Sequence, residues 1–70
     1  MKLKEIRQKA GYRTQNDFAK AINFSKSRWG CIEANEKLIL TLTFEKAYLV
    51  SKMLKIRFDE LYRMGVNGGN

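Results

Sequence analysis

Residues 26–34 combine side chains that could contact nucleic acid along one side of a short helix. Trp29 and Ile32 lie three residues apart, which predicts an apolar back that packs onto another helix. The opposite side carries small, polar or cationic side chains: Lys26, Ser27, Arg28, Gly30 and Cys31. A helix with an apolar back and a slim cationic front suits the major groove of DNA, which is wide enough to admit an α-helix.

The residues before this helix predict a second helix that is joined to it by a tight turn. Phe18 and Ile22 lie four residues apart, on one face of a helix. Asn23 follows, and asparagine tolerates the left-handed conformation in which a helix stops abruptly. Phe24 would fill the gap between the two helices, and the Ser25 hydroxyl can accept from the free amides of the next helix. The pattern predicts a helix, a turn and a helix.

Apolar periodicity and capping residues predict an all-α fold of five helices. The expected helices span residues 2–10, 15–22, 26–34, 44–54 and 58–62. Thr14 is placed to cap the second helix, with Asp17 three residues on as a partial capping box. Thr43 would cap the fourth helix, whose inward stripe is expected to include Phe44. Asn35 is expected to end the third helix in a left-handed conformation.

Length and composition indicate one small globular domain. The chain has 70 residues, of which 44% are hydrophobic. We expect the domain to span residues 1–63 and residues 64–70, which include three glycines, to form a disordered tail. No apolar run approaches membrane-spanning length and the N-terminus lacks an apolar signal segment, so the sequence predicts a cytoplasmic protein without a membrane partner.

The residue types argue against enzyme activity. One cysteine and no histidine exclude a disulfide framework and disfavour a structural zinc site. Cys31 has no histidine to activate it as a nucleophile. Without a carboxylate pair or a glycine-rich phosphate loop, we expect no catalytic residues, cofactor, metal or small-molecule substrate.

Positive charge is concentrated in the first half of the chain. Residues 1–30 hold eight basic and two acidic side chains, a net charge of +6. Residues 31–70 hold six basic and five acidic side chains, a net charge of +1. Such an uneven division favours a polyanionic partner, double-stranded DNA above all, over a uniformly solubilised surface.

Residues 38–43 do not fit the helical pattern. The segment reads Leu-Ile-Leu-Thr-Leu-Thr and has a strand-like composition. Its alternating leucines either fold onto the core as a long loop or are covered by another subunit, and the sequence does not decide between these alternatives. Tyr48, Leu49 and Met53 fall partly outside the inward stripe of the helix expected over residues 44–54. The expected protein interface therefore comprises Leu38, Leu40, Leu42, Tyr48, Leu49 and Met53.

With these residues placed, the segment from Leu3 to Tyr62 resembles the phage Cro and lambda-repressor-like family of five-helix DNA-binding domains. The resemblance rests on four segments and on the final helix: Leu3–Arg7, Thr14–Ala19, Phe24–Ser27, Ile32–Glu33 and Leu54–Tyr62. It implies a helix-turn-helix formed by the second and third helices. Asn23, Asn35 and Lys55 depart from it, because they stand where the family usually has glycine.

The resemblance also implies roles for individual residues. Base contacts fall to Lys26, Ser27 and Cys31, and phosphate contacts to Gln15, Arg28 and Lys37, with Arg13 and Lys9 as further cations of the basic half. From the residues alone, Gln15 could equally be an ordinary solvated side chain. Glu33 is expected to pair internally with Arg7, and Glu36 would bring a negative charge near the expected phosphate path.

Two functions follow as expectations. The first is a small sequence-specific transcriptional regulator, a Cro-like repressor that binds operator DNA as a dimer with its third helix in the major groove. The alternative is an antirepressor or antitoxin-like protein that binds another regulator through the Leu38–Leu42 segment and the fourth helix, as a heteromer.

Overall fold

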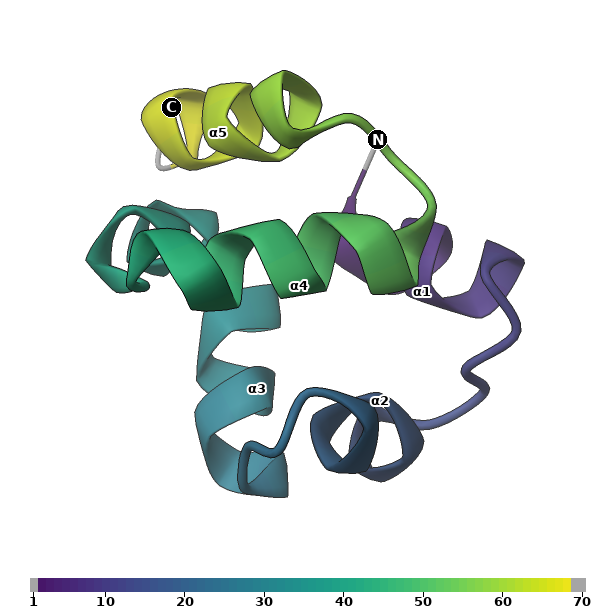
Figure 1. The fold of residues 1–70 in the computed structure, drawn as a ribbon. Coiled ribbons are helices and arrows are strands. Elements are labelled where there is room, and N and C mark those ends of the chain that lie inside the picture. Colours follow the sequence, from purple (N-terminus) through teal and green to yellow (C-terminus); the bar gives the residue numbers. More distant parts are fainter. Residues whose placement is uncertain (1, 69–70) are drawn as a thin grey trace.

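The computed structural model describes residues 2–68, and Met1, Gly69 and Asn70 lie outside the described residues. Over this range the chain is all-α, with five α-helices and one 3₁₀ helix and no strand (Figure 1). The elements are α1 (Leu3–Lys9), α2 (Gln15–Ala21), α3 (Lys26–Ala34), η1 (Glu36–Thr41), α4 (Phe44–Leu54) and α5 (Phe58–Asn67). In Figure 1, α5 lies above α4, and α2 and α3 lie below it.

Side-chain hydroxyls fix the starts of three helices, as the sequence predicts. The Thr14 hydroxyl accepts from the Asp17 amide at 3.0 Å and begins α2. The Ser25 hydroxyl accepts from the Arg28 amide at 3.1 Å and begins α3. Thr43 caps α4 in the same way, and each cap satisfies an amide that the helix leaves without an internal partner.

The helix ends follow the predictions in part. Asn23, with φ of 60°, is left-handed as expected and allows the sharp turn between α2 and α3. Lys55, with φ of 61°, is also left-handed and ends α4. The prediction for Asn35 was wrong, because this residue is extended. Its side-chain oxygen instead accepts from the Lys37 amide at 3.3 Å, so Asn35 caps η1.

The core lies where all six helices meet. α2 packs on α3, η1 packs on both α3 and α5, and α4 packs on α5. Trp29 and Phe18 are fully buried, and their ring centroids lie 4.5 Å apart. The buried apolar residues are Leu3, Ile6, Phe18, Ala19, Ile22, Trp29, Ile32, Ile39, Ala47, Val50, Leu54 and Leu61.

The Leu38–Leu42 region is neither a strand nor a plain loop, because most of it forms the helix η1. An extended strand with its leucines inward would bury Leu40 and expose Ile39. The helical turn does the opposite, because it buries Ile39 and leaves Leu40 exposed. Leu38 and Leu42 are half-buried and pack against the core. The segment therefore folds onto the domain, and its only exposed leucine is Leu40.

The expectation of a disordered tail from residue 64 was wrong for residues 64–67, which extend α5 to Asn67. Gly65 is buried, and a Cβ there would lie 3.1 Å from side-chain atoms of both Ile39 and Leu40. This glycine therefore lets α5 approach η1 closely. Met64 packs against the core beside it. The last two residues of the expected tail lie outside the described residues.

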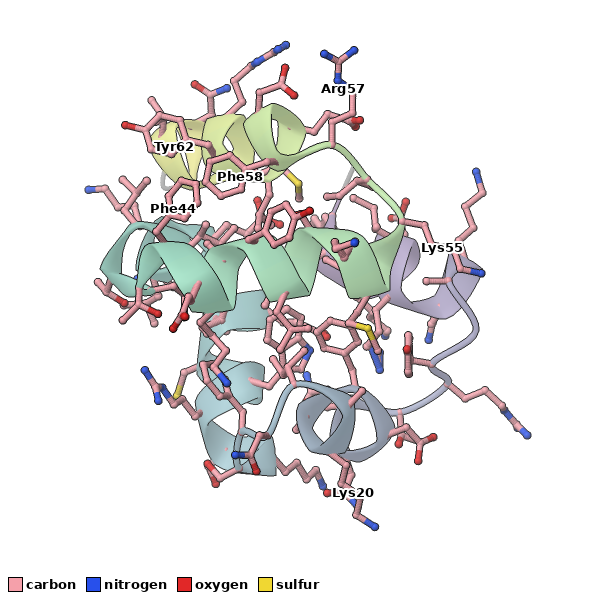
Figure 2. The ribbon with its side chains drawn as sticks, in the orientation of Figure 1. Lys20, Phe44, Lys55, Arg57, Phe58 and Tyr62 are labelled. Atoms are coloured by element: carbon pink, nitrogen blue, oxygen red, sulfur yellow. The ribbon has the colours of Figure 1, made fainter. Side chains whose placement is uncertain are left out.

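Phe44 does not point inward as expected. Its side chain is 73% exposed at the start of α4, and its ring centroid lies 5.0 Å from that of Phe58 (Figure 2). The inward stripe of α4 begins instead at Ala47 and continues through Val50, Ser51 and Leu54.

The left-handed conformation of Lys55 predicts that glycine would fit this position better. A residue other than glycine loses about 1–2 kcal/mol of stability in the left-handed conformation. Glycine avoids this strain, but it loses more backbone entropy on folding, which offsets part of the gain. Lys55→Gly should therefore stabilise the fold by about 0.5–1 kcal/mol. The same substitution at Lys52, within α4, should destabilise it by about 1 kcal/mol. Urea unfolding measures both, and destabilisation by Lys55→Gly would contradict this interpretation.

Candidate nucleic-acid interface

One side of α3 is free to contact a ligand while the other side is buried. Trp29 and Ile32 are buried against the core, as predicted. Lys26, Ser27 and Cys31 are exposed. The side of α3 that the sequence assigned to base contacts is thus accessible and carries short or flexible polar side chains.

Arg28 lies in the first turn of α3, directly after the turn that joins α2 to α3. Its guanidinium carbon lies 4.1 Å from the centre of the Phe24 ring, which is a cation–π distance. The side chain is exposed, and stacking on Phe24 limits where it can move. Lys46 supports the same turn from α4, since its ammonium group donates to the carbonyl oxygen of Ile22 at 2.8 Å. The start of α3 therefore presents a partly oriented cation.

Gln15 is not an ordinary solvated side chain. It is half-buried, and its amide nitrogen donates to Oε1 of Glu33 at 3.2 Å. A Cβ at Gly30 would lie 3.0 Å from the Gln15 side-chain oxygen, so the glycine leaves room for this amide. The Gln15 nitrogen carries a second hydrogen, because a primary amide has two donors.

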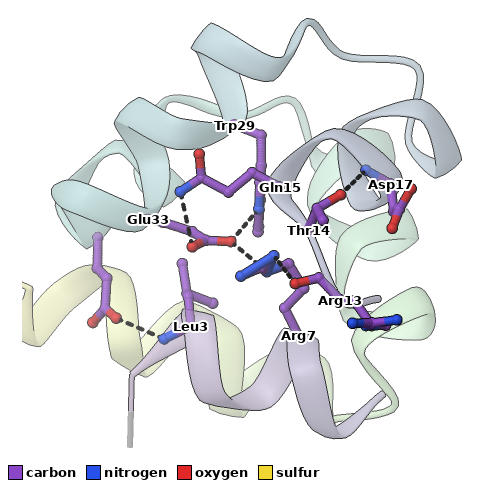
Figure 3. Close-up of polar contacts among 9 residues, drawn as sticks. Leu3, Arg7, Arg13, Thr14, Gln15, Asp17, Trp29 and Glu33 are labelled. Carbon is purple, nitrogen blue, oxygen red and sulfur yellow. Dashed lines mark hydrogen bonds and ion pairs between the residues drawn. The ribbon is translucent and has the colours of Figure 1, made fainter. Parts of the chain in front are cut away.

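Glu33 is the centre of a buried polar network that joins three helices (Figure 3). Its Oε2 lies 2.9 Å from Nε of Arg7, and both side chains are at most 5% exposed. The indole nitrogen of Trp29 donates to the same oxygen. Nη1 of Arg7 donates to the carbonyl oxygen of Arg13 at 3.4 Å. The expected Arg7–Glu33 pair is therefore confirmed, and it ties α1 and the connection to α2 onto α3.

The remaining cations expected near phosphates are all exposed. Lys9 ends α1, Arg13 lies in the connection to α2, and Lys37 lies in η1. Within residues 2–68, none of these three side chains forms an ion pair. By contrast, Asp59 on α5 pairs with both Arg57 and Arg63. Among the described residues, Arg7 is thus the one cation of the first half that forms an ion pair.

Glu36 is occupied within the fold. Its carboxylate accepts from the Leu3 amide at 3.1 Å, at the start of α1, where a negative charge is favourable. The Glu36 carboxylate, which the sequence places near the expected phosphate path, therefore holds the start of α1 to η1.

The expected protein interface is brought together only in part. Leu40 and Tyr48 are exposed. The other four members, Leu38, Leu42, Leu49 and Met53, are half-buried against the core. The exposed apolar residues that the sequence missed are Phe44, Tyr62 and Val66. The apolar spacing of Phe58, Tyr62 and Val66, each four residues from the next, was a signal for this face of α5.

Nowhere in residues 2–68 do three histidine, cysteine, aspartate or glutamate side chains gather as they would around a metal ion. No helix in the same range is both long enough and apolar enough to cross a membrane. The chain matches no protein-family model, no curated protein and no solved structure at a significant level.

The Glu33 network predicts a large effect from a nearly isosteric change. Glu33→Gln would leave the buried Arg7 guanidinium without a counter-charge, which should destabilise the fold by about 3 kcal/mol or more. Glu36→Gln, a matched control at a half-buried carboxylate, should cost about 1 kcal/mol or less because the amide oxygen can still accept. Urea unfolding compares the two, and equal small losses would show that the network contributes little.

The double variant Arg7→Met/Glu33→Gln tests whether Glu33→Gln loses stability because Arg7 has lost its counter-charge or because the packing has changed. It removes the unpaired charge and keeps an oxygen for the Trp29 indole. It should therefore regain much of the stability that Glu33→Gln alone loses. A double variant as unstable as the single one would contradict the electrostatic explanation.

Proposed function

We propose that the chain is a small DNA-binding transcriptional regulator that places α3 in the major groove, in the manner of lambda-repressor-like domains. The observation that carries this proposal is α3 itself: its apolar back is buried and its exposed side carries Lys26, Ser27 and Cys31. A protein with this role would work in the cytoplasm.

The arrangement of α2 and α3 supports a helix-turn-helix. The two helices pack on each other and are joined by the four residues Ile22–Ser25. Left-handed Asn23 and the Ser25 cap set this connection. In helix-turn-helix proteins the second helix lies in the major groove with its first residues on base edges, and Lys26 and Ser27 occupy that place in α3.

Base readout would be carried by few side chains. A lysine can donate to the acceptors of guanine, and a serine hydroxyl can donate or accept. Cys31, one turn further on, is short and only weakly polar. Lys26 is the longest of the three, so we assign it the largest share of the sequence discrimination.

Phosphate contacts would come from the exposed cations around α3. Lys9, Arg13, Arg28 and Lys37 are exposed and free of ion pairs within the described residues. Gln15 would add the second hydrogen of its amide nitrogen, the first being held by Glu33. Contacts of this kind orient a protein on the duplex without reading its sequence.

The alternative, capture of another regulator, has less support. It was based on the apolar Leu38–Leu42 segment and the fourth helix, and of the six expected interface residues only Leu40 and Tyr48 are exposed. It also leaves unexplained why, among the described residues, the exposed cations of α1 to α3 form no ion pairs. A protein of this second kind would bind DNA weakly and without sequence preference.

The proposal predicts that Lys26→Ala reduces sequence discrimination. A preferred site is first selected from a random-sequence duplex pool with the parent protein. Lys26→Ala should then bind this site more weakly, with discrimination against one base pair reduced by roughly 1–3 kcal/mol, while binding to random duplex changes little. Lys52→Ala, which removes the same charge from α4, should bind both duplexes as the parent does. Fluorescence anisotropy measures all six affinities, of the parent and both variants for the two duplexes.

A Lys26→Ala variant that distinguishes the selected site from random DNA as well as the parent does would contradict this assignment. Failure to select any preferred site would contradict sequence-specific binding itself.

A further inference from the structure

Gly30 lies in the middle of α3, where glycine disfavours the helix. Its backbone is regularly helical and does not need the left-handed conformation that often selects glycine. Alanine would favour the helix more, because glycine loses more conformational freedom when the chain folds. The backbone of α3 therefore gives no reason for a glycine here, and the reason lies in the space that its missing side chain leaves open.

The space beside Gly30 is occupied by the side-chain amide of Gln15. Outside its own helix, the three atoms nearest to a Cβ at residue 30 would be Oε1 of Gln15 at 3.0 Å, Cδ at 3.7 Å and Nε2 at 3.9 Å. Both residues are half-buried where α2 packs on α3. A contact of 3.0 Å is tighter than nearly all real Cβ contacts, so a methyl group on Gly30 would push the amide aside.

The Gln15 amide is held on a second side by Glu33. Its nitrogen donates to Oε1 of Glu33 at 3.2 Å (Figure 3). The Glu33 carboxylate is itself fixed by its buried ion pair with Arg7. Because one amide hydrogen is bound to Glu33 and the amide lies against Gly30, the direction of the second hydrogen is set before any ligand arrives.

We infer that Gly30 is a positioning residue, which lets the Gln15 amide keep the orientation in which its second hydrogen binds a DNA phosphate. The inference rests on the proposed function, in which Gln15 contacts a phosphate. A donor that is already oriented loses less conformational entropy on binding than a mobile side chain does, so displacing the amide should weaken the contact. Helix stability and DNA affinity therefore make opposite demands on residue 30.

Binding to a random-sequence duplex at constant salt, measured by fluorescence anisotropy, tests the inference, because phosphate contacts do not depend on base sequence. Gly30→Ala should weaken binding about 5-fold, as the loss of one hydrogen bond does, and Gln15→Ala should weaken it to a similar extent. In the Gln15→Ala background, Gly30→Ala should cause no further loss, because the amide that it displaces is already absent.

Urea unfolding of the same four proteins separates positioning from a general structural role. In the Gln15→Ala background, Gly30→Ala should raise the folding equilibrium constant about 5-fold through its higher helix propensity. In the parent the gain should be smaller, because the Gln15 amide must move away from Glu33 to make room. The expected Gly30→Ala protein is thus at least about as stable as the parent and yet binds duplex more weakly.

A Gly30→Ala variant that binds duplex as tightly as the parent would overturn the inference and leave the proposed function intact. Equal losses of affinity in the two backgrounds would also overturn it, because the added methyl group would then act on the DNA directly and not through Gln15. A parent that binds no duplex would contradict the proposed function itself. The two stability gains would then decide whether Gly30 orients Gln15, and equal gains would show that it does not.

Discussion

The buried ion pair between Arg7 and Glu33 is the interaction on which the arrangement of the helices depends most. Removing one partner of a charged pair that is almost completely buried is strongly destabilising, because the other partner is left as an uncompensated buried charge. Here the Glu33 carboxylate also accepts from Trp29 and Gln15, and Arg7 also donates to the Arg13 carbonyl. One carboxylate thus sets the position of α1, of the start of α2 and of the Trp29 ring, which in turn fixes which side of α3 faces solvent.

This network also explains the division of the surface. With Trp29 and Ile32 held inward, the short polar side of α3 remains exposed. Within the described residues, the exposed cations of α1 to α3 form no ion pairs. The apolar residues that the core does not take up lie on η1, α4 and α5 instead. One small domain thereby carries most of its unpaired exposed cations on and between α1 to α3 and its exposed large hydrophobic side chains on η1, α4 and α5, among the described residues.

Local signals in the sequence were enough to predict the first three helices and their connections. Thr14, Ser25 and Asn23 act through neighbouring backbone atoms, so their roles follow from sequence spacing alone. The resemblance to a known family predicted the Arg7–Glu33 pair, which spacing could not reveal. That Gln15 uses its amide on Glu33 depends on the tertiary position of Gly30 and was not predictable.

The second half of the chain was harder to predict because its structure depends on contacts distant in sequence. Alternating leucines suggested an extended segment, but packing against α3 and α5 favours the helix η1, which buries Ile39. Glycine-rich composition suggested a tail, but Gly65 is what allows α5 to continue along η1. Phe44 appeared inward from its spacing on α4, although the first turn of that helix extends past the core.

The central claim is that the uncompensated cations around α3 bind the phosphates of double-stranded DNA. Its most direct test is the affinity for a short duplex as a function of salt concentration. If Lys9, Arg13, Arg28 and Lys37 each neutralise one phosphate, the logarithm of the binding constant should fall with the logarithm of the salt concentration with a slope of about −3 to −4. A binding constant that is the same at low and at moderate salt would contradict the claim.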